Sequence, residues 1–219
     1  LFPALVFLMF GVPAARRGGP ELAPVLMASF AAYGVVSVVL FQFGVGVATD
    51  RVSPWHRYVR TLPVSPGTLL AARLASAVCF AVLTAAGVVA LAVGVTGVRL
   101  PAPAWLRLLA GLLLGSLPFG ALGFALGYWS SPRGVVPLAN LVYFPMAYAG
   151  GLFFPPQVLP QVLQKLAPFL PTYRYGQIVW RAAWGEPWRA ADWLALLAYG
   201  LLFAAVALAG YRREQVERY

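Results

Sequence analysis

Long apolar runs without a charged side chain restrict the fold of this sequence more than any other feature. A helix rises ~1.5 Å per residue, so about 20 residues cross a hydrocarbon core of ~30 Å. Six candidate runs are 1–13, 25–48, 74–97, 108–128, 134–154 and 193–211. The first is short, and we interpret it as the end of a truncated span. The runs predict an all-α polytopic membrane protein with six transmembrane helices in a single domain over 1–219.

The composition agrees with a chain that lies in lipid. Of its 219 residues, 61% are hydrophobic and only 10% are charged, and the mean hydropathy is +0.79. Soluble chains contain about 45–50% apolar and about 25% charged residues, so a soluble domain of this size could not bury this much apolar surface. The runs also lack the alternating pattern of membrane barrel strands, which favours helices.

The charged residues argue against nucleic acid as a partner. The chain has sixteen Lys and Arg residues and six Asp and Glu residues, for a net charge of +10. They are scattered between apolar blocks, which favours contact with lipid headgroups. If 49–73, 129–133 and 212–219 share one side of the membrane, the 16 basic residues divide into eight and eight. Charge counts therefore leave the orientation open.

Motifs for catalysis and metal binding are missing from the sequence. The single lysine, Lys165, follows Gln164 rather than glycine, so no phosphate-binding loop of the Gly-Lys-Ser/Thr type is present. One histidine, His56, and one cysteine, Cys79, are too few for a zinc site. The centres of the runs contain no ionisable residue. We expect a transport subunit rather than an enzyme, with an amphipathic or lipid-like cargo and an energy source in another subunit.

Residues 49–66 form a charged, aromatic segment between two apolar runs. The segment contains Asp50, four Arg or His residues and the aromatic residues Trp55 and Tyr58, and it ends in Pro63 and Pro66. One interpretation is a short amphipathic helix on the membrane surface. An equally good one is a solvated loop that its aromatic side chains anchor to the membrane.

Two pairs of glycines with a spacing of four flank Pro118: Gly111 and Gly115 precede it, and Gly123 and Gly127 follow it. Such pairs allow helix backbones to approach closely, and the proline is expected to bend the helix. Packing within one chain and a seam between two copies are both open.

Residues 150–189 are too rich in proline for a continuous span. Five prolines would cut the segment into pieces of one to three turns: Pro155, Pro156, Pro160, Pro168 and Pro171. We expect short re-entrant or interfacial helices. A repeat of Trp180, Trp184 and Trp188 predicts one helix that lies in the membrane interface with these rings on one face.

Over its whole length the sequence resembles the membrane subunit of ATP-binding cassette (ABC) exporters of the type-2 permease class. The most specific stretch is 48–66, and its matching residues are Asp50, Arg51, Trp55, Arg57, Arg60, Pro63 and Pro66. A second stretch resembles the family's split extracellular hairpin, with Gly150, Gly151, Pro155, Pro160, Pro168 and Pro171.

The resemblance implies a location, partners and a mechanism. It places 49–66 and the C-terminal tail in the cytoplasm, and 155–189 outside the cell membrane. The segment 49–66 would be a coupling helix that docks a separate ATPase subunit, and ATP and Mg would bind to that partner rather than to this chain. Two permease chains would pair as a homodimer or heterodimer and export a drug, lipid or glycan.

An alternative class stays open at this point. A secondary transporter or channel would also consist of helices interrupted by glycine and proline, and it would need no ATPase partner. A membrane-embedded enzyme is disfavoured because clustered acidic, basic or metal-binding groups are missing.

Overall fold

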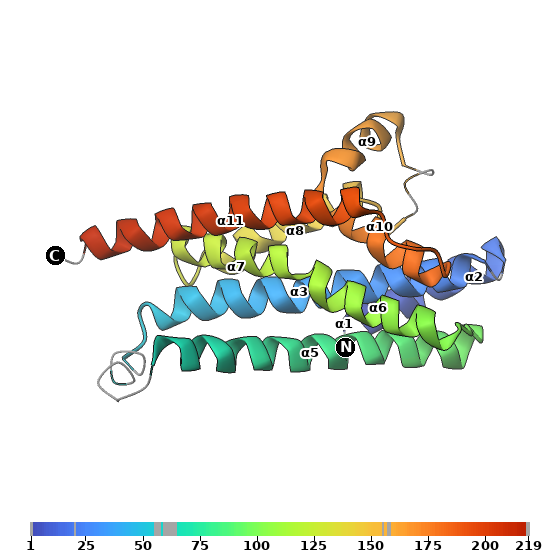
Figure 1. The fold of residues 1–219 in the computed structure, drawn as a ribbon, viewed down its shortest axis with the longest axis horizontal. Helices are drawn as coiled ribbons and strands as arrows, with labels where there is room; N and C mark the ends of the chain where they lie inside the picture. Colours follow the sequence, from blue (N-terminus) through green and yellow to red (C-terminus); the bar gives the residue numbers. More distant parts are fainter. Residues whose placement is uncertain are drawn as a thin grey trace.

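The computed structural model describes residues 2–19, 21–54, 58, 65–154, 156 and 159–217. Helices account for nearly all of this part of the chain, and the longest of them lie side by side along the long axis of the molecule (Figure 1). Four helical segments are long and apolar enough to cross a membrane: Leu22–Asp50, Gly67–Thr96, Ala102–Trp129 and Ala190–Gln215. The prediction of an all-α polytopic membrane protein is confirmed.

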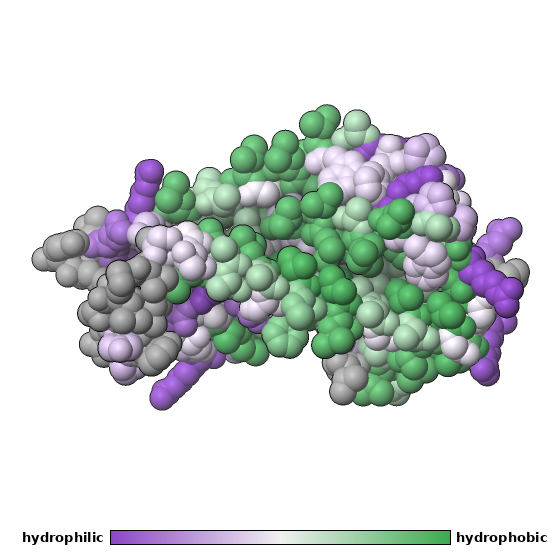
Figure 2. All heavy atoms as spheres, turned by 60° about the horizontal axis from the view of Figure 1, so that its bottom comes forward, coloured by the Kyte–Doolittle hydropathy of each residue, from purple (hydrophilic) through white to green (hydrophobic). Residues whose placement is uncertain are grey.

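Helix α3, Leu22–Asp50, is the central helix of the bundle. It packs against α5 (Pro66–Thr96), α7 (Leu117–Trp129) and α10 (Pro171–Ala183). Its most apolar window is 78% buried, whereas those of α5 and α11 (Ala190–Glu217) are only 22% and 17% buried. Hydrophobic side chains cover the middle of the molecule, and hydrophilic ones gather toward its two ends (Figure 2). The apolar faces of α5 and α11 are therefore available to lipid or to another membrane chain.

Local signals in the sequence set the two ends of α5. The hydroxyl of Ser65 accepts a hydrogen bond from the amide of Thr68 at 3.2 Å, and Pro66 occupies the first helical position. At the other end, Gly97 adopts a left-handed conformation with φ of +67° and donates its amide to the Val93 carbonyl. The predicted run 74–97 thus lies in a helix that begins eight residues earlier, at Pro66, and ends at Thr96.

The fourth apolar run is interrupted at Ser116, close to Pro118. Helix α6 covers Ala102–Gly115, and α7 begins at Leu117. Two side chains donate to carbonyls in the last turn of α6. The Ser116 hydroxyl donates to the Leu113 carbonyl at 2.8 Å, and the Tyr175 hydroxyl donates to the Leu112 carbonyl at 2.9 Å. Tyr175 therefore attaches α10 to α6 next to this interruption.

Two of the predicted runs differ from the helices in the structure. Helix α8 covers only Val135–Ala149, so the expectation of a continuous span over 134–154 is wrong for its last five residues. The chain turns at Gly150 and Gly151, where φ is +85° at Gly151. The described part of the run 1–13 begins at Phe2 and lies in α1 (Phe2–Val6), the π-helical turn η1 (Phe7–Gly11) and α2, which continues to Gly18. The count of six spans stays a prediction.

Short helices occupy 150–189, as the prolines predict: α9 (Gln161–Leu166), the 3-10 turn η3 (Ala167–Phe169) and α10. Helix α10 ends at Ala183, so the predicted stripe of three tryptophans on one helix is wrong. Trp180 is buried and donates from Nε1 to the Ser29 hydroxyl of α3 at 2.6 Å, Trp184 is exposed, and Trp188 lies beyond the helix.

Helix α10 is embedded in the bundle rather than laid on its surface. Nine of its 13 residues are buried, and it contacts α3, α6 and α11. Arg174 attaches it at one end, because this side chain donates to the Pro168 carbonyl at 2.9 Å and pairs with Asp192 of α11 at 3.1 Å. The short helices thus complete one end of the bundle.

Candidate coupling site at the end of the bundle

The site lies at the end of the bundle where α3 leads into the segment 49–66 (Figure 1). Asp50 is the last residue of α3, and Arg51 follows it as the C-cap. Successive helical residues point about 100° apart, so these two side chains reach different neighbours. The carboxylate of Asp50 forms an ion pair with Arg73 of α5. Arg51 turns instead toward α7 and α11.

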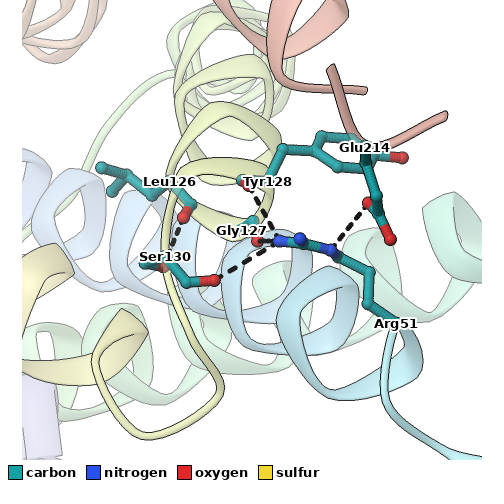
Figure 3. A network of polar contacts seen from close by, with 6 residues as sticks. All are labelled: Arg51, Leu126, Gly127, Tyr128, Ser130 and Glu214. Atoms are coloured by element: carbon teal, nitrogen blue, oxygen red, sulfur yellow. Dashed lines mark hydrogen bonds and ion pairs between the residues drawn. The ribbon is translucent and has the colours of Figure 1, made fainter. Parts of the chain in front are cut away.

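Arg51 caps the C-terminal end of α7 (Figure 3). Its Nη1 donates to the carbonyl oxygens of Gly127 at 2.9 Å and Tyr128 at 2.8 Å, and to that of Ser130 at 3.4 Å. The last carbonyls of a helix lack intrahelical partners and carry partial negative charge, which makes them good acceptors for a guanidinium group.

The same arginine reaches α11 through an ion pair. Its Nε lies 2.7 Å from Oε2 of Glu214, and its guanidinium carbon lies 5.9 Å from the centre of the Tyr128 ring. The side chains of Arg51 and Glu214 are 28% and 15% exposed, so solvent screens this pair only in part. Asp50 and Arg51 together connect the four longest spans of the described chain, α3, α5, α6–α7 and α11, at one end.

Glycines allow the close contact of α3 and α7 on which this site depends. A Cβ atom at Gly123 would lie 2.6 Å from the Leu40 carbonyl oxygen, and one at Gly127 would lie 2.7 Å from the Gly44 carbonyl oxygen. Gly127 therefore serves twice, because its missing side chain admits α3 and its carbonyl accepts from Arg51. Gly111 and Gly115 instead face Ile178 and Tyr175 of α10 within the same chain.

Several residues singled out from the sequence lie outside the described residues: Trp55, Arg57, Arg60, Pro63 and Pro155. Pro66 begins α5. In the hairpin, Pro160 precedes α9, Pro168 lies in η3 and Pro171 begins α10. Gly150 and Gly151 form the turn after α8, and the Thr172 hydroxyl, in contact with Gly150, donates to the Met146 carbonyl at 2.5 Å.

Sequence reasoning missed the partners of Arg51. Glu214 directly follows Arg212 and Arg213, and this placement is the one signal that could have marked it. Nothing in the sequence relates Glu214 to Arg51, because the two residues lie far apart along the chain. Within the described part of the chain, no three His, Cys, Asp or Glu residues gather to hold a metal ion.

Comparison with known proteins identifies the family. The family model described as "ABC-2 family transporter protein" matches residues 19–209. The chain belongs to the ABC-2 transporter family. It is also similar to "Putative transport permease YvfS" of Bacillus subtilis (strain 168), with 25% identity over 189 residues that cover 86% of this chain and 76% of the relative. No solved structure matches the chain.

Membership of the ABC-2 family, together with the apolar helices, makes this chain a multi-pass membrane permease. It indicates a transport subunit rather than an enzyme, and it implies an ABC ATPase as partner in general. The resemblance noted from 48–66 and from the hairpin is thereby confirmed at the level of the family.

Proposed function

We propose that this ABC-2 chain is the permease subunit of an ATP-driven exporter and that its separate ATPase subunit docks on the segment 49–66. The observation that carries the proposal is the double attachment of Asp50 and Arg51 directly before that segment. These two residues hold α5, α7 and α11 against α3. A displacement of 49–66 is therefore transmitted to four spans together.

The mechanism is a shift between two packings of the bundle. ATP and Mg bind to the partner, and closure of its nucleotide sites displaces 49–66. The apolar span interiors are rigid, so the displacement moves whole helices rather than bending them locally. The ATPase partner has two states, which bind this segment with different affinities. The difference in binding free energy between these states sets how strongly the partner favours one packing of the bundle.

The proposed cargo is amphipathic or lipid-like: a drug, a lipid or a glycan. The support for this cargo is the apolar character of the four described spans, each of which is long and apolar enough to cross a membrane. The exposed apolar faces of α5 and α11 suit a second permease chain, the same or a related one, as well as lipid. The proposed location is the inner membrane, with Arg51 and the C-terminal tail on the cytoplasmic side.

The test uses the permease together with its ATPase subunit in proteoliposomes that contain a fluorescent lipid. Arg51→Ala should retain the ATPase subunit and ATP hydrolysis but lose most ATP-dependent lipid movement. Arg133→Ala is the matched control, because Arg133 is an exposed arginine at the same end of the bundle. It is not part of the Arg51 clamp, by which we mean the contacts of Arg51 with the last carbonyls of α7 and with Glu214. Movement of lipid by the permease alone, without ATP, would overturn the proposal in favour of a secondary transporter or channel.

A further inference from the structure

The end of the bundle that carries Arg51 also contains an open cavity that has no part in the proposed coupling to the ATPase. The cavity has a volume of about 310 Å³, and its lining includes Arg51, Trp129, Ser131, Arg213 and Glu214. A second cavity of about 400 Å³ adjoins it and shares Arg51, Ser131 and Glu214. Volumes of this order are at the lower end of those found for ligand sites.

The charged side chains that line the first cavity favour an anion as its ligand. The lining contains two arginines, Arg51 and Arg213, and one carboxylate, that of Glu214, which forms its ion pair with Arg51. The planar guanidinium group is the side chain best suited to bind phosphate oxygens, because it offers several donors in a fixed geometry. Arg213 is held at the cavity by the ring of Trp129, whose centre lies 5.6 Å from the guanidinium carbon.

The depth of the cavity is that of phospholipid headgroups. The charge-free part of α11, 193–211, extends roughly 28 Å at ~1.5 Å per residue, close to the ~30 Å of the hydrocarbon core. Arg213 and Glu214 therefore lie just beyond the core. Trp129 is 50% exposed and donates to the Val206 carbonyl at 3.0 Å, as expected of an aromatic ring at the membrane boundary.

An apolar track leads from the cavity toward the middle of the membrane. Leu202 and Val206 are exposed on α11, and with Gly210 and Arg213 they follow the spacing of one helix face. The Trp129 ring rests on Gly210, where a Cβ atom would lie 2.6 Å from its Nε1. The track gives an acyl chain an apolar surface beside the arginine, which a soluble anion would not use.

We propose that this cavity binds the phosphate of an anionic phospholipid, with an acyl chain along Leu202 and Val206. The inference requires only that the chain lies in a membrane, and it is independent of the ATPase partner. Bound lipid would bridge α7 and α11 beside the Arg51 clamp.

The test is native mass spectrometry of the purified full chain with phosphatidylglycerol or with zwitterionic phosphatidylcholine. Arg213→Gln should weaken the retention of phosphatidylglycerol roughly five- to tenfold, in line with the loss of one arginine contact at a membrane surface. Arg212→Gln is the matched control, because it removes the same charge from the adjacent position, which lines neither cavity. It should stay within about twofold of the wild type, and phosphatidylcholine should bind weakly throughout.

Three results would overturn the proposal. Equal losses in both variants would show a general effect of surface charge, and no loss in Arg213→Gln would show that the lipid does not bind at Arg213. Displacement of the lipid by an equal concentration of soluble glycerol phosphate would identify a site for free phosphate esters. The assay contains no ATPase, so failure of the exporter proposal would leave its result unchanged.

Discussion

At the scale of single residues, short polar side chains on the helices bond mostly within their own helix. The hydroxyls of Ser37 and Ser76 donate to carbonyls four residues earlier, and the amide of Asn140 does the same. The exceptions join helices: the Tyr143 hydroxyl donates to the Tyr33 carbonyl at 2.8 Å, and Trp180 donates to Ser29. A carbonyl of the same helix is always within reach of a short side chain, whereas these longer side chains reach a neighbouring helix.

The pair of Trp180 and Ser29 predicts a non-additive effect on stability. Ser29→Ala leaves the indole N–H of Trp180 buried without a partner, which costs ~1–3 kcal/mol. Replacing both residues in Trp180→Phe plus Ser29→Ala removes the unsatisfied donor, so the added cost of Ser29→Ala should be smaller in the Trp180→Phe background. Unfolding temperatures in detergent are compared for the wild type, the two single variants and the double variant. Trp184→Phe, at an exposed ring, should change the unfolding temperature little.

Gly127 predicts a penalty for added bulk between α3 and α7. In Gly127→Ala the new methyl group would meet the Gly44 carbonyl and the Val47 side chain, at 2.7 and 2.8 Å, so the helices must separate. Overpacking of this kind costs ~1–3 kcal/mol. Gly94→Ala on α5 is the matched control, because its Cβ would meet nothing within 4 Å. An unfolding temperature equally low in both variants would contradict the packing argument.

At the scale of elements, the sequence predicts where spans lie but not how they bend or what fills the bends. The thickness of the hydrocarbon core fixes the length of apolar runs, which is why 25–48 and 193–211 fall inside α3 and α11. The burial of α10 depends on Tyr175 reaching Leu112 and on Trp180 reaching Ser29, and no local pattern encodes contacts so distant in sequence. The same holds for the Arg51 clamp, of which the sequence indicated only the arginine.

Tyr175 predicts how α10 is held in the bundle. Tyr175→Phe retains the ring but leaves the Leu112 carbonyl at the bend without its donor, at a cost of ~1–3 kcal/mol. We expect faster amide hydrogen exchange in α10 and the end of α6, measured by mass spectrometry. Tyr148→Phe removes a hydroxyl from an exposed tyrosine and should leave exchange in α10 unchanged. Faster exchange throughout the protein would instead indicate global destabilisation.

At the scale of the whole molecule, the two ends of the bundle have different structures. One end gathers the Arg51 clamp, the turn between α7 and α8 and the C-terminal part of α11, whereas the other is completed by α9 and α10 (Figure 1). The counts of basic residues do not orient such a chain, but the proposed coupling to a cytoplasmic ATPase does. The side of the membrane on which the Arg51 end lies therefore tests whether a cytoplasmic ATPase can reach it.

Cysteine labelling of the chain in its native membrane tests that sidedness. In a Cys79→Ala background, a cysteine is introduced at Ser131, between α7 and α8, or at Gln161 in α9, both of which are exposed. A membrane-impermeant maleimide added to intact cells should label Gln161→Cys but reach Ser131→Cys only after the membrane is opened, because the two positions lie at opposite ends of the spans. Cys79→Ala alone is the control and should remain unlabelled. Labelling of Ser131→Cys from outside would place the Arg51 clamp beyond the reach of a cytoplasmic ATPase and so contradict the proposed coupling.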